Sequence, residues 1–389
     1  MSIAVGVTAC GFSLDAPMAH SPAFAALAVS PNDLAAMLVL LSLAGFGALT
    51  LLRTAQRSVT RLVPAGAFAR RFWSGVSWSL GVTHRTRVAT PGRLGAYALQ
   101  RKIGEGGQGI VYQARHADSR RLLAIKLMAG DRSQARVRRF EREGRLTAGL
   151  GHPNTVTIYD QGRTPEGVSY YAMELLDGLT LAELVERHGP LPAGRAIHVL
   201  VQLGAALEAA HARGLVHRDI KPANVYVCAR DYPPDFVKLL DFGLVREVDA
   251  GSDPAVSGAD TLVGTPLFLS PEAITAPAQV DARADIYGVG AVAYFLMTGR
   301  TPFQGRNAVE VCAHHLHTTP EAPSRYAPVP HDLESVILAC LAKDPAERPA
   351  NARALLRALE CCEARGSWQE TDAVRWWECH GSVNPQPRT

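Results

Sequence analysis

A long apolar run occupies residues 34–52, LAAMLVLLSLAGFGALTLL, and contains 19 residues without a charged side chain. At about 1.5 Å per helical residue, a helix of this length just crosses a hydrocarbon core of roughly 30 Å. A buried core helix is the alternative, but such helices rarely lack charged side chains over this length. The pattern therefore predicts a transmembrane helix at 34–52.

The hydrophobic pattern changes after residue 97. Alternating apolar and polar residues, broken by glycines, predict strands over residues 99–127, and the spacing over 133–149 predicts a helix. After residue 173 the pattern is mostly helical, for example at 193–213 and 332–342. We therefore expect an α+β fold with a small β-rich lobe followed by a larger α-helical lobe.

The basic residues give the apolar run a direction. No Lys or Arg precedes Arg53, whereas eight Arg and no acidic residue occur between Arg53 and Arg93. Basic residues that flank a span stay on the cytoplasmic side of the membrane. The N-terminus is therefore expected outside the cell, and the chain after Arg53 is expected on the cytoplasmic side of the cell membrane. A cleaved signal peptide is disfavoured, since no basic region precedes the run. The linker at 53–96 either lies on anionic lipid or is a disordered tether.

Composition excludes some classes of function. The net charge of +4 is too small to suggest a nucleic-acid partner. The seven cysteines form no C-x-x-C pair, so neither a disulfide framework nor a zinc site is expected.

A glycine-rich segment begins at Gly104 and reads GEGGQGIVY, which fits G-x-G-x-x-G-x-V. A dinucleotide-binding site would place a helix directly after the glycines, but residues 110–114 continue as a strand. The motif therefore predicts a hairpin covering the phosphates of a nucleotide. Lys126, one hairpin later, is expected to pair with those phosphates and with a carboxylate on the next helix. Glu143 is the preferred partner, and Glu141 is its rival.

The most specific motif is His217-Arg218-Asp219-Ile220-Lys221-Pro222-Ala223-Asn224, with Asp241-Phe242-Gly243 beginning 22 residues after Asp219. At these residues the sequence resembles the bacterial eukaryotic-type serine/threonine protein kinases, over about two thirds of the chain. The resemblance implies a two-lobed protein kinase fold, with ATP and Mg²⁺ as cofactors and protein Ser/Thr hydroxyls as substrates.

The resemblance assigns roles that agree with the chemistry of phosphoryl transfer, which needs positioning and charge neutralisation. Asp219 would orient the acceptor hydroxyl, and Asn224 and Asp241 would hold Mg²⁺. Lys221 would reach the γ-phosphate, and a lysine there marks Ser/Thr specificity. The implied catalytic residues are Asp219, Lys126, Glu143 and Lys221.

The resemblance also implies an ATP pocket, in which Met173 lies at the hinge between the lobes and backbone groups of Glu174 and Leu176 bind adenine. The expected ATP-binding residues are Ile103, Gly104, Glu105, Gly106, Gly107, Gln108, Gly109, Ile110, Val111, Ala124, Lys126, Met173, Glu174, Leu176 and Tyr226. Core packing is the simpler reading of each apolar residue taken alone.

The segment from Asp241 to Glu272 has the length of an activation loop, and it ends in Ser-Pro-Glu where the family more often has Ala-Pro-Glu. By resemblance, Thr265 touches Asp219, Glu272 pairs with Arg348, and Asp285 braces the catalytic loop.

Arg218 is expected to lack a partner until a nearby phosphate arrives. A phosphothreonine would supply that charge. Thr261 is the first candidate acceptor and Ser257 the second, reached in trans by self-association.

These inferences divide the chain into five parts: an extracytoplasmic segment at 1–33, a transmembrane helix at 34–52, a basic juxtamembrane linker at 53–96, a kinase domain at 97–358 and a tail at 359–389. Residues 228–237 are expected to form a solvated turn, and the tryptophans of the tail to pack on the large lobe. Two rival functions are a pseudokinase scaffold and a small-molecule kinase. The presence of Lys126, Asp219 and Asp241 argues against the first, and the substrate segment 264–272 against the second.

Overall fold

The computed structural model describes residues 92–106, 109–129, 133–164, 166–241, 246–247 and 266–381. All of them belong to one unit, residues 88–389. The predicted transmembrane segment at 34–52 lies outside the described residues. Within the described ranges, no helix has the length and apolar character needed to cross a bilayer.

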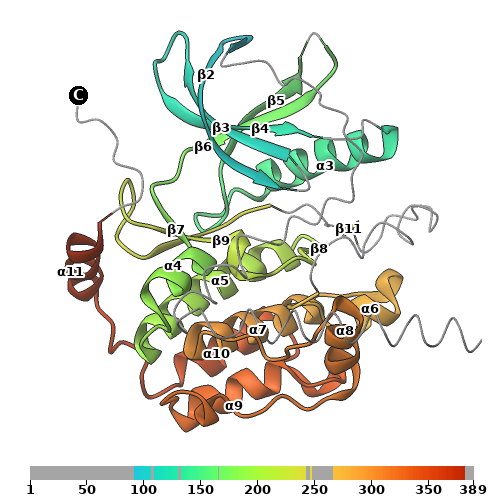
Figure 1. Cartoon of the computed structure of the whole chain (residues 1–389), viewed down its shortest axis with the longest axis vertical. Helices are drawn as coiled ribbons and strands as arrows, with labels where there is room; N and C mark the ends of the chain where they lie inside the picture. The colour runs from blue at the N-terminus through green and yellow to red at the C-terminus, as the bar shows by residue number, and fades with distance from the viewer. Residues whose placement is uncertain are drawn as a thin grey trace, which may run out of the picture. The chain divides into compact units, whose positions relative to one another are not determined.

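The N-terminal lobe is a six-stranded antiparallel sheet in the order β1-β2-β3-β4-β6-β5 (Figure 1). The sheet begins at residue 93, slightly before the predicted domain boundary at 97. Its strands are β1 (Arg93–Leu94), β2 (Tyr97–Gly106), β3 (Gly109–His116), β4 (Leu122–Met128), β5 (Ile158–Arg163) and β6 (Ser169–Glu174).

Side-chain alternation along β4 decides which residues can reach a ligand. Leu123, Ile125 and Leu127 are buried in one hydrophobic cluster of the lobe. Since successive side chains of a strand point to opposite faces, Ala124 and Lys126 share the other face. The apolar alternation of the sequence thus aims Lys126 away from this cluster.

Helix α3 (Gln134–Leu150) agrees with the predicted helix at 133–149 to within one residue. It ends at Gly151, whose φ of 58° is the left-handed conformation that glycine adopts at low cost. Phe140 of α3 packs against the ring of Tyr171 in β6, with centroids 5.1 Å apart. This contact fixes α3 against the sheet.

The C-terminal lobe is helical, as predicted, and its core is formed largely by α5 and α7. The observed α5 and α9 agree with the predicted helices at 193–213 and 332–342 to within two residues. The helices are α4 (Leu181–His188), α5 (Ala193–His211), α6 (Pro271–Thr275), α7 (Arg283–Thr298), α8 (Ala308–His317), α9 (His331–Cys340), α10 (Ala352–Glu360) and α11 (Glu370–His380).

Short strands line the junction between the lobes. Strands β7, β9 and β10 form one antiparallel sheet, and β8 pairs with β11. Their bounds are β7 (Gly178–Thr180), β8 (Leu215–Val216), β9 (Val225–Cys228), β10 (Phe236–Leu239) and β11 (Arg246–Glu247), and the 3₁₀ turn η2 covers Pro222–Asn224. Thr155 bridges to Leu239, which ties the two lobes together.

The prediction of a solvated turn at 228–237 is wrong in part. Asp235 is fully buried, because the tail covers it and supplies hydrogen-bond donors. Helix α10 ends at Glu360, and the Cys361–Cys362 pair directly follows it. Cys362 is buried, whereas Cys361 is exposed.

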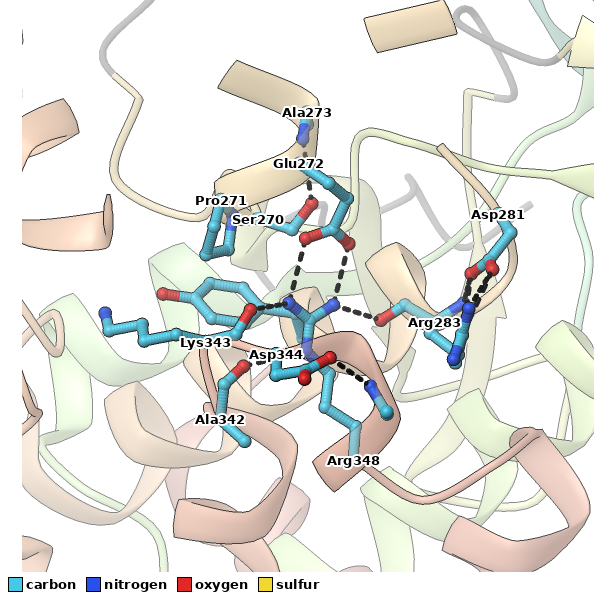
Figure 2. A network of polar contacts seen from close by, with 12 residues as sticks. Ser270, Pro271, Glu272, Ala273, Asp281, Arg283, Ala342, Lys343, Asp344 and Arg348 are labelled. Atoms are coloured by element: carbon cyan, nitrogen blue, oxygen red, sulfur yellow. Dashed lines mark hydrogen bonds and ion pairs between the residues drawn. The ribbon is translucent and has the colours of Figure 1, made fainter. Parts of the chain in front are cut away.

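An ion pair anchors Glu272, the last residue of the segment predicted to be the activation loop. Arg348 donates from Nη1 and Nη2 to the two carboxylate oxygens of Glu272, at 2.7 and 2.8 Å (Figure 2). The same guanidinium donates to the carbonyl oxygens of Ala342, Arg283 and Lys343. All of these contacts satisfy a buried cation, so the pair is structural, as the resemblance implied.

A close contact between α7 and α9 at Gly290 gives a test of the packing. A Cβ added to Gly290 would lie 2.6 Å from Cys340 Cβ. We expect Gly290→Ala to lower the free energy of unfolding by about 1–3 kcal/mol, measured by denaturant titration. Gly149→Ala is the control, because nothing lies within 4 Å of the added methyl group. An equal loss of stability in both variants would contradict this packing.

Candidate active site

The buried ammonium group of Lys126 is the centre of the site. Its Nζ lies 2.9 Å from Glu143 Oε1 on α3 and 2.7 Å from Asp241 Oδ1. Lys126 is only 3% exposed, so these carboxylates replace the water that the ammonium loses. The structure thus brings together three residues that the sequence placed 17 and 115 positions apart.

Burial and neighbouring charges shift the pKa values of Lys126 and Glu143. Burial acts to lower the pKa of Lys126, but the carboxylates of Asp241 and Glu143 outweigh it and raise the pKa above its ordinary value. Burial also raises the pKa of Glu143, against the opposing effect of Lys126. The lysine therefore remains a cation that can meet phosphate.

The rival partner Glu141 has a different role. It accepts hydrogen bonds from Arg163 Nε at 2.6 Å and from Ser169 Oγ at 2.8 Å. These bonds hold Glu141 against strands β5 and β6. Glu143, as preferred from the sequence, is the glutamate that pairs with Lys126.

Tyr171 is a site residue that the sequence reasoning missed. Its hydroxyl lies 2.9 Å from Glu143 Oε1 and 3.3 Å from Asp241 Oδ1. Burial, reinforced by these two carboxylates, raises its pKa well above the usual range, so the phenol stays a donor. A signal existed, because Tyr171 precedes the hinge residue Met173 by two positions and so shares its face of β6.

The catalytic-loop residues converge on Asp219. Lys221 Nζ lies 2.9 and 2.7 Å from the two carboxylate oxygens of Asp219. Asn224 Nδ2 donates to the carbonyl oxygen and to Oδ2 of the same residue, at 2.8 and 2.9 Å. The aspartate that is expected to orient a hydroxyl is thereby held in one position.

Asp285 of α7 braces this loop, as the resemblance implied. Its carboxylate accepts from the backbone amides of His217 at 2.8 Å and Arg218 at 2.7 Å, and from His211 Nε2. Burial acts to raise the pKa of Asp285, but these hydrogen bonds more than offset it and lower the pKa. Arg218 has a φ of 66°, which is a strained conformation for a residue with a Cβ. The hydrogen bonds from the two backbone amides to Asp285 hold it in this conformation.

Asn224 and Asp241 fit a magnesium ion by their chemistry. The amide nitrogen of Asn224 is used on Asp219, so its oxygen is the atom that can ligate a cation. Asp241 supplies a carboxylate that is partly exposed. Mg²⁺ binds such oxygens and completes its shell with water and phosphate oxygens.

Several residues expected to surround adenine are neighbours in the sheet next to the hinge. Ala124 pairs with Met173 across β4 and β6, and Val111 pairs with Lys126 across β3 and β4. Tyr226 on β9 donates its hydroxyl to the carbonyl oxygens of Leu176 and Gly178, which lie 3.3 and 2.9 Å away. These hydrogen bonds link β9 to the hinge.

The glycine-rich hairpin forms as predicted, with Gly106 paired to Gly109 and Glu105 paired to Ile110. A Cβ at Gly109 would lie 2.4 Å from the carbonyl oxygen of Leu127, so only glycine permits this close approach. Gly104 and Ile103 lie on the same strand, β2. Gly107 and Gln108 lie outside the described residues.

The prediction that Arg218 lacks a partner until a phosphate arrives is wrong. Its guanidinium donates to the carbonyl oxygens of Pro277 and Val280, at 3.4 and 3.0 Å, so a phosphate is not required to give it partners. Both carbonyls precede α7: Pro277 begins a short 3₁₀ turn at Pro277–Gln279, and Val280 directly follows that turn. Thr261, Ser257 and Thr265 lie outside the described residues.

The hydroxyl of Tyr171 can be tested without an assay of activity. Tyr171→Phe keeps the ring against Phe140 but removes the donor to a buried carboxylate. We expect the free energy of unfolding to fall by about 1–3 kcal/mol, measured by denaturant titration. Tyr170→Phe is the matched control, because that hydroxyl serves the more exposed Asp160 and its loss should cost less. A cost for Tyr171→Phe no greater than for the control would contradict this role.

Comparison with known proteins places these residues in a family. A model of the protein kinase domain matches residues 97–359. The serine/threonine-protein kinase pkn3 of Myxococcus xanthus is 36% identical over 301 residues, covering 75% of this chain and 54% of that protein. Pkn1 of the same organism is 41% identical over 271 residues, covering 69% and 38%. PknB of Mycobacterium tuberculosis is 38% identical over 268 residues, covering 67% and 42%.

The chain thus spans about half, or less, of the length of these curated relatives. The match nevertheless covers both lobes and every described residue of the site. On this evidence the chain belongs to the protein kinase domain family.

Proposed function

We propose that this chain is a serine/threonine protein kinase that transfers the γ-phosphoryl group of Mg-ATP to hydroxyls of protein substrates. Its substrates include Ser and Thr hydroxyls of the kinase chain itself. The observation that carries the proposal is the joint placement of Lys126 with Glu143 and of Asp219 with Lys221 and Asn224. The relatives named serine/threonine-protein kinases support the same activity.

The residues divide the work of transfer between them. Lys126 holds the α- and β-phosphates, and Glu143 keeps its ammonium in place. Asp219 accepts a hydrogen bond from the substrate hydroxyl and orients it for attack. Lys221, whose ammonium is hydrogen-bonded to the Asp219 carboxylate, stabilises negative charge on the transferred phosphoryl group. Asn224 and Asp241 would hold Mg²⁺, which supplies neutralisation of the phosphate charge when bound.

Two other functions fit less well. A pseudokinase scaffold would lack the lysine, the catalytic aspartate or the metal ligand, and here Lys126, Asp219 and Asp241 are all present. A small-molecule kinase would lack the peptide-binding segment that ends at Glu272, and here Glu272 is anchored by Arg348.

The catalytic assignment predicts the loss of autophosphorylation in Asp219→Asn and Lys126→Met. We expect the rate to fall by a factor on the order of 10²–10⁴ or more while the fold is retained, because each change removes a group that stabilises the transition state. Transfer of labelled phosphate from ATP measures the rate, and mass spectrometry locates the product, expected at Thr261 first and Ser257 second. Asp118→Asn, in an exposed turn, is the control. Near-normal turnover in either active-site variant would refute the assignment.

The same proposal includes anchoring in the cell membrane. The charge-free run at 34–52 and the eight arginines that follow support a single span with the kinase domain in the cytoplasm. Anchoring would also concentrate copies of the chain, which favours phosphorylation of one copy by another.

Reporter fusions test this topology. A reporter active only in the cytoplasm should work when fused after Gly95, and one active only outside should work at the N-terminus. The physical reason is the retention of arginines on the cytoplasmic side. The opposite pattern would refute the orientation, and recovery of the whole protein in the soluble fraction would refute the span.

A further inference from the structure

The connection between β9 and β10 ends in a carboxylate that is completely buried. Asp235, 0% exposed, accepts from Arg195 Nε and Nη2 at 2.9 and 2.8 Å. It also accepts from the indole nitrogens of Trp368 and Trp377, at 2.9 and 2.8 Å. Four donors therefore satisfy one carboxylate, and two of them come from the tail.

The tail also covers the cation. Arg195 Cζ lies 3.9 Å from the ring centroid of Trp376 and 5.0 Å from that of Trp368. We call Arg195, Asp235, Trp368, Trp376 and Trp377 the tail cluster. Its tryptophans follow residue 359, where the family match ends, and α11 carries two of them (Figure 1). The tail is thus hydrogen-bonded to the β9–β10 connection of the C-terminal lobe.

The same loop reaches the hinge with its other side chains. Tyr232 donates its hydroxyl to Glu174 Oε2 at 2.5 Å and stacks on Phe236, with centroids 4.9 Å apart. Lys238 Nζ lies 2.9 Å from Glu174 Oε1 and 4.3 Å from the centroid of the Tyr232 ring. Burial, together with Glu174, raises the pKa of Tyr232, so its hydroxyl remains a donor.

We propose that Tyr232, Asp235 and the tail tryptophans are positioning residues for nucleotide binding, acting through Glu174. The inference rests on the proposed function and on the expectation that backbone groups of Glu174 bind adenine. Only two residues separate Tyr232 from Asp235, so an anchored Asp235 restricts where the phenol can lie.

The backbone of the connection between β9 and β10 is strained, and the hydrogen bonds to Asp235 hold it in place. Asp231 and Asp235 have φ values of 65° and 64°, which are costly for residues with a Cβ. The four hydrogen bonds on Asp235 offset this strain, and without them the loop is free to relax away from Glu174. Glu174 would then keep Lys238 but lose Tyr232, and the hinge would be held less firmly.

The test measures ATP affinity in the full chain, purified in detergent micelles. Tyr232→Phe removes one hydroxyl at the hinge, and Trp377→Phe removes one donor at the tail while keeping a ring. For each we expect Kd and KM for Mg-ATP to rise by a factor of about 3–10, which corresponds to roughly 0.7–1.4 kcal/mol, with kcat within about twofold of wild type. The double variant should show no more than the larger single effect, because both act through one loop.

Two controls match these changes. Tyr326→Phe removes an exposed hydroxyl that donates to Glu321, and Val374→Ala shortens an exposed side chain of α11. Both should leave ATP affinity unchanged. Thermal melting of every variant confirms that it is folded.

The outcomes separate this inference from the proposed function. Unchanged ATP affinity in folded Tyr232→Phe and Trp377→Phe would overturn the inference and leave the proposed function intact. A lower melting temperature and lower kcat with unchanged KM would also overturn it, since the cluster would then be merely structural. A wild-type chain that binds no Mg-ATP would overturn the proposed function itself.

Discussion

The need to satisfy the buried ammonium of Lys126 determines how the site is assembled. A cation that is almost removed from water must meet opposite charge, and here Glu143 and Asp241 lie within 2.9 Å of it. One partner comes from helix α3 and the other follows the strand β10. The single ammonium therefore links the sheet, the helix and the catalytic lobe. Tyr171 donates to Glu143 Oε1, the same oxygen that accepts from this ammonium.

A second constraint lies in the catalytic loop. The left-handed conformation at Arg218 is unfavourable, and the carboxylate of Asp285 holds it through two backbone amides. This geometry presents Asp219 to Lys221 and Asn224. A buried helix, α7, thus supplies the rigidity that positioning of a hydroxyl requires. The loop is joined to the Lys126 cluster through Leu240, which precedes Asp241. The Leu240 amide donates to the carbonyl oxygen of Asn224, and the Leu240 carbonyl oxygen accepts from His217 Nε2.

The lobes are joined where adenine is expected. Tyr226 bonds to two hinge carbonyls, and Glu174 is held by Tyr232 and Lys238. Tyr226 lies on β9, Lys238 on β10 and Tyr232 in the connection between these strands. Because the tail clamps that connection at Asp235, residues after the family match contribute to the structure around the hinge.

The sequence by itself determined the fold class, the hairpin, the helix at 133–149 and the identity of the residues around Asp219. These follow from local periodicity and from the order of the motifs, both of which can be read directly along the sequence. Only the tertiary structure decided that Glu143 outcompetes Glu141, that Tyr171 joins the site, that carbonyls serve Arg218 and that Asp235 is buried. Each of these depends on which side chains approach across long stretches of chain, and spacing along the sequence does not encode that approach.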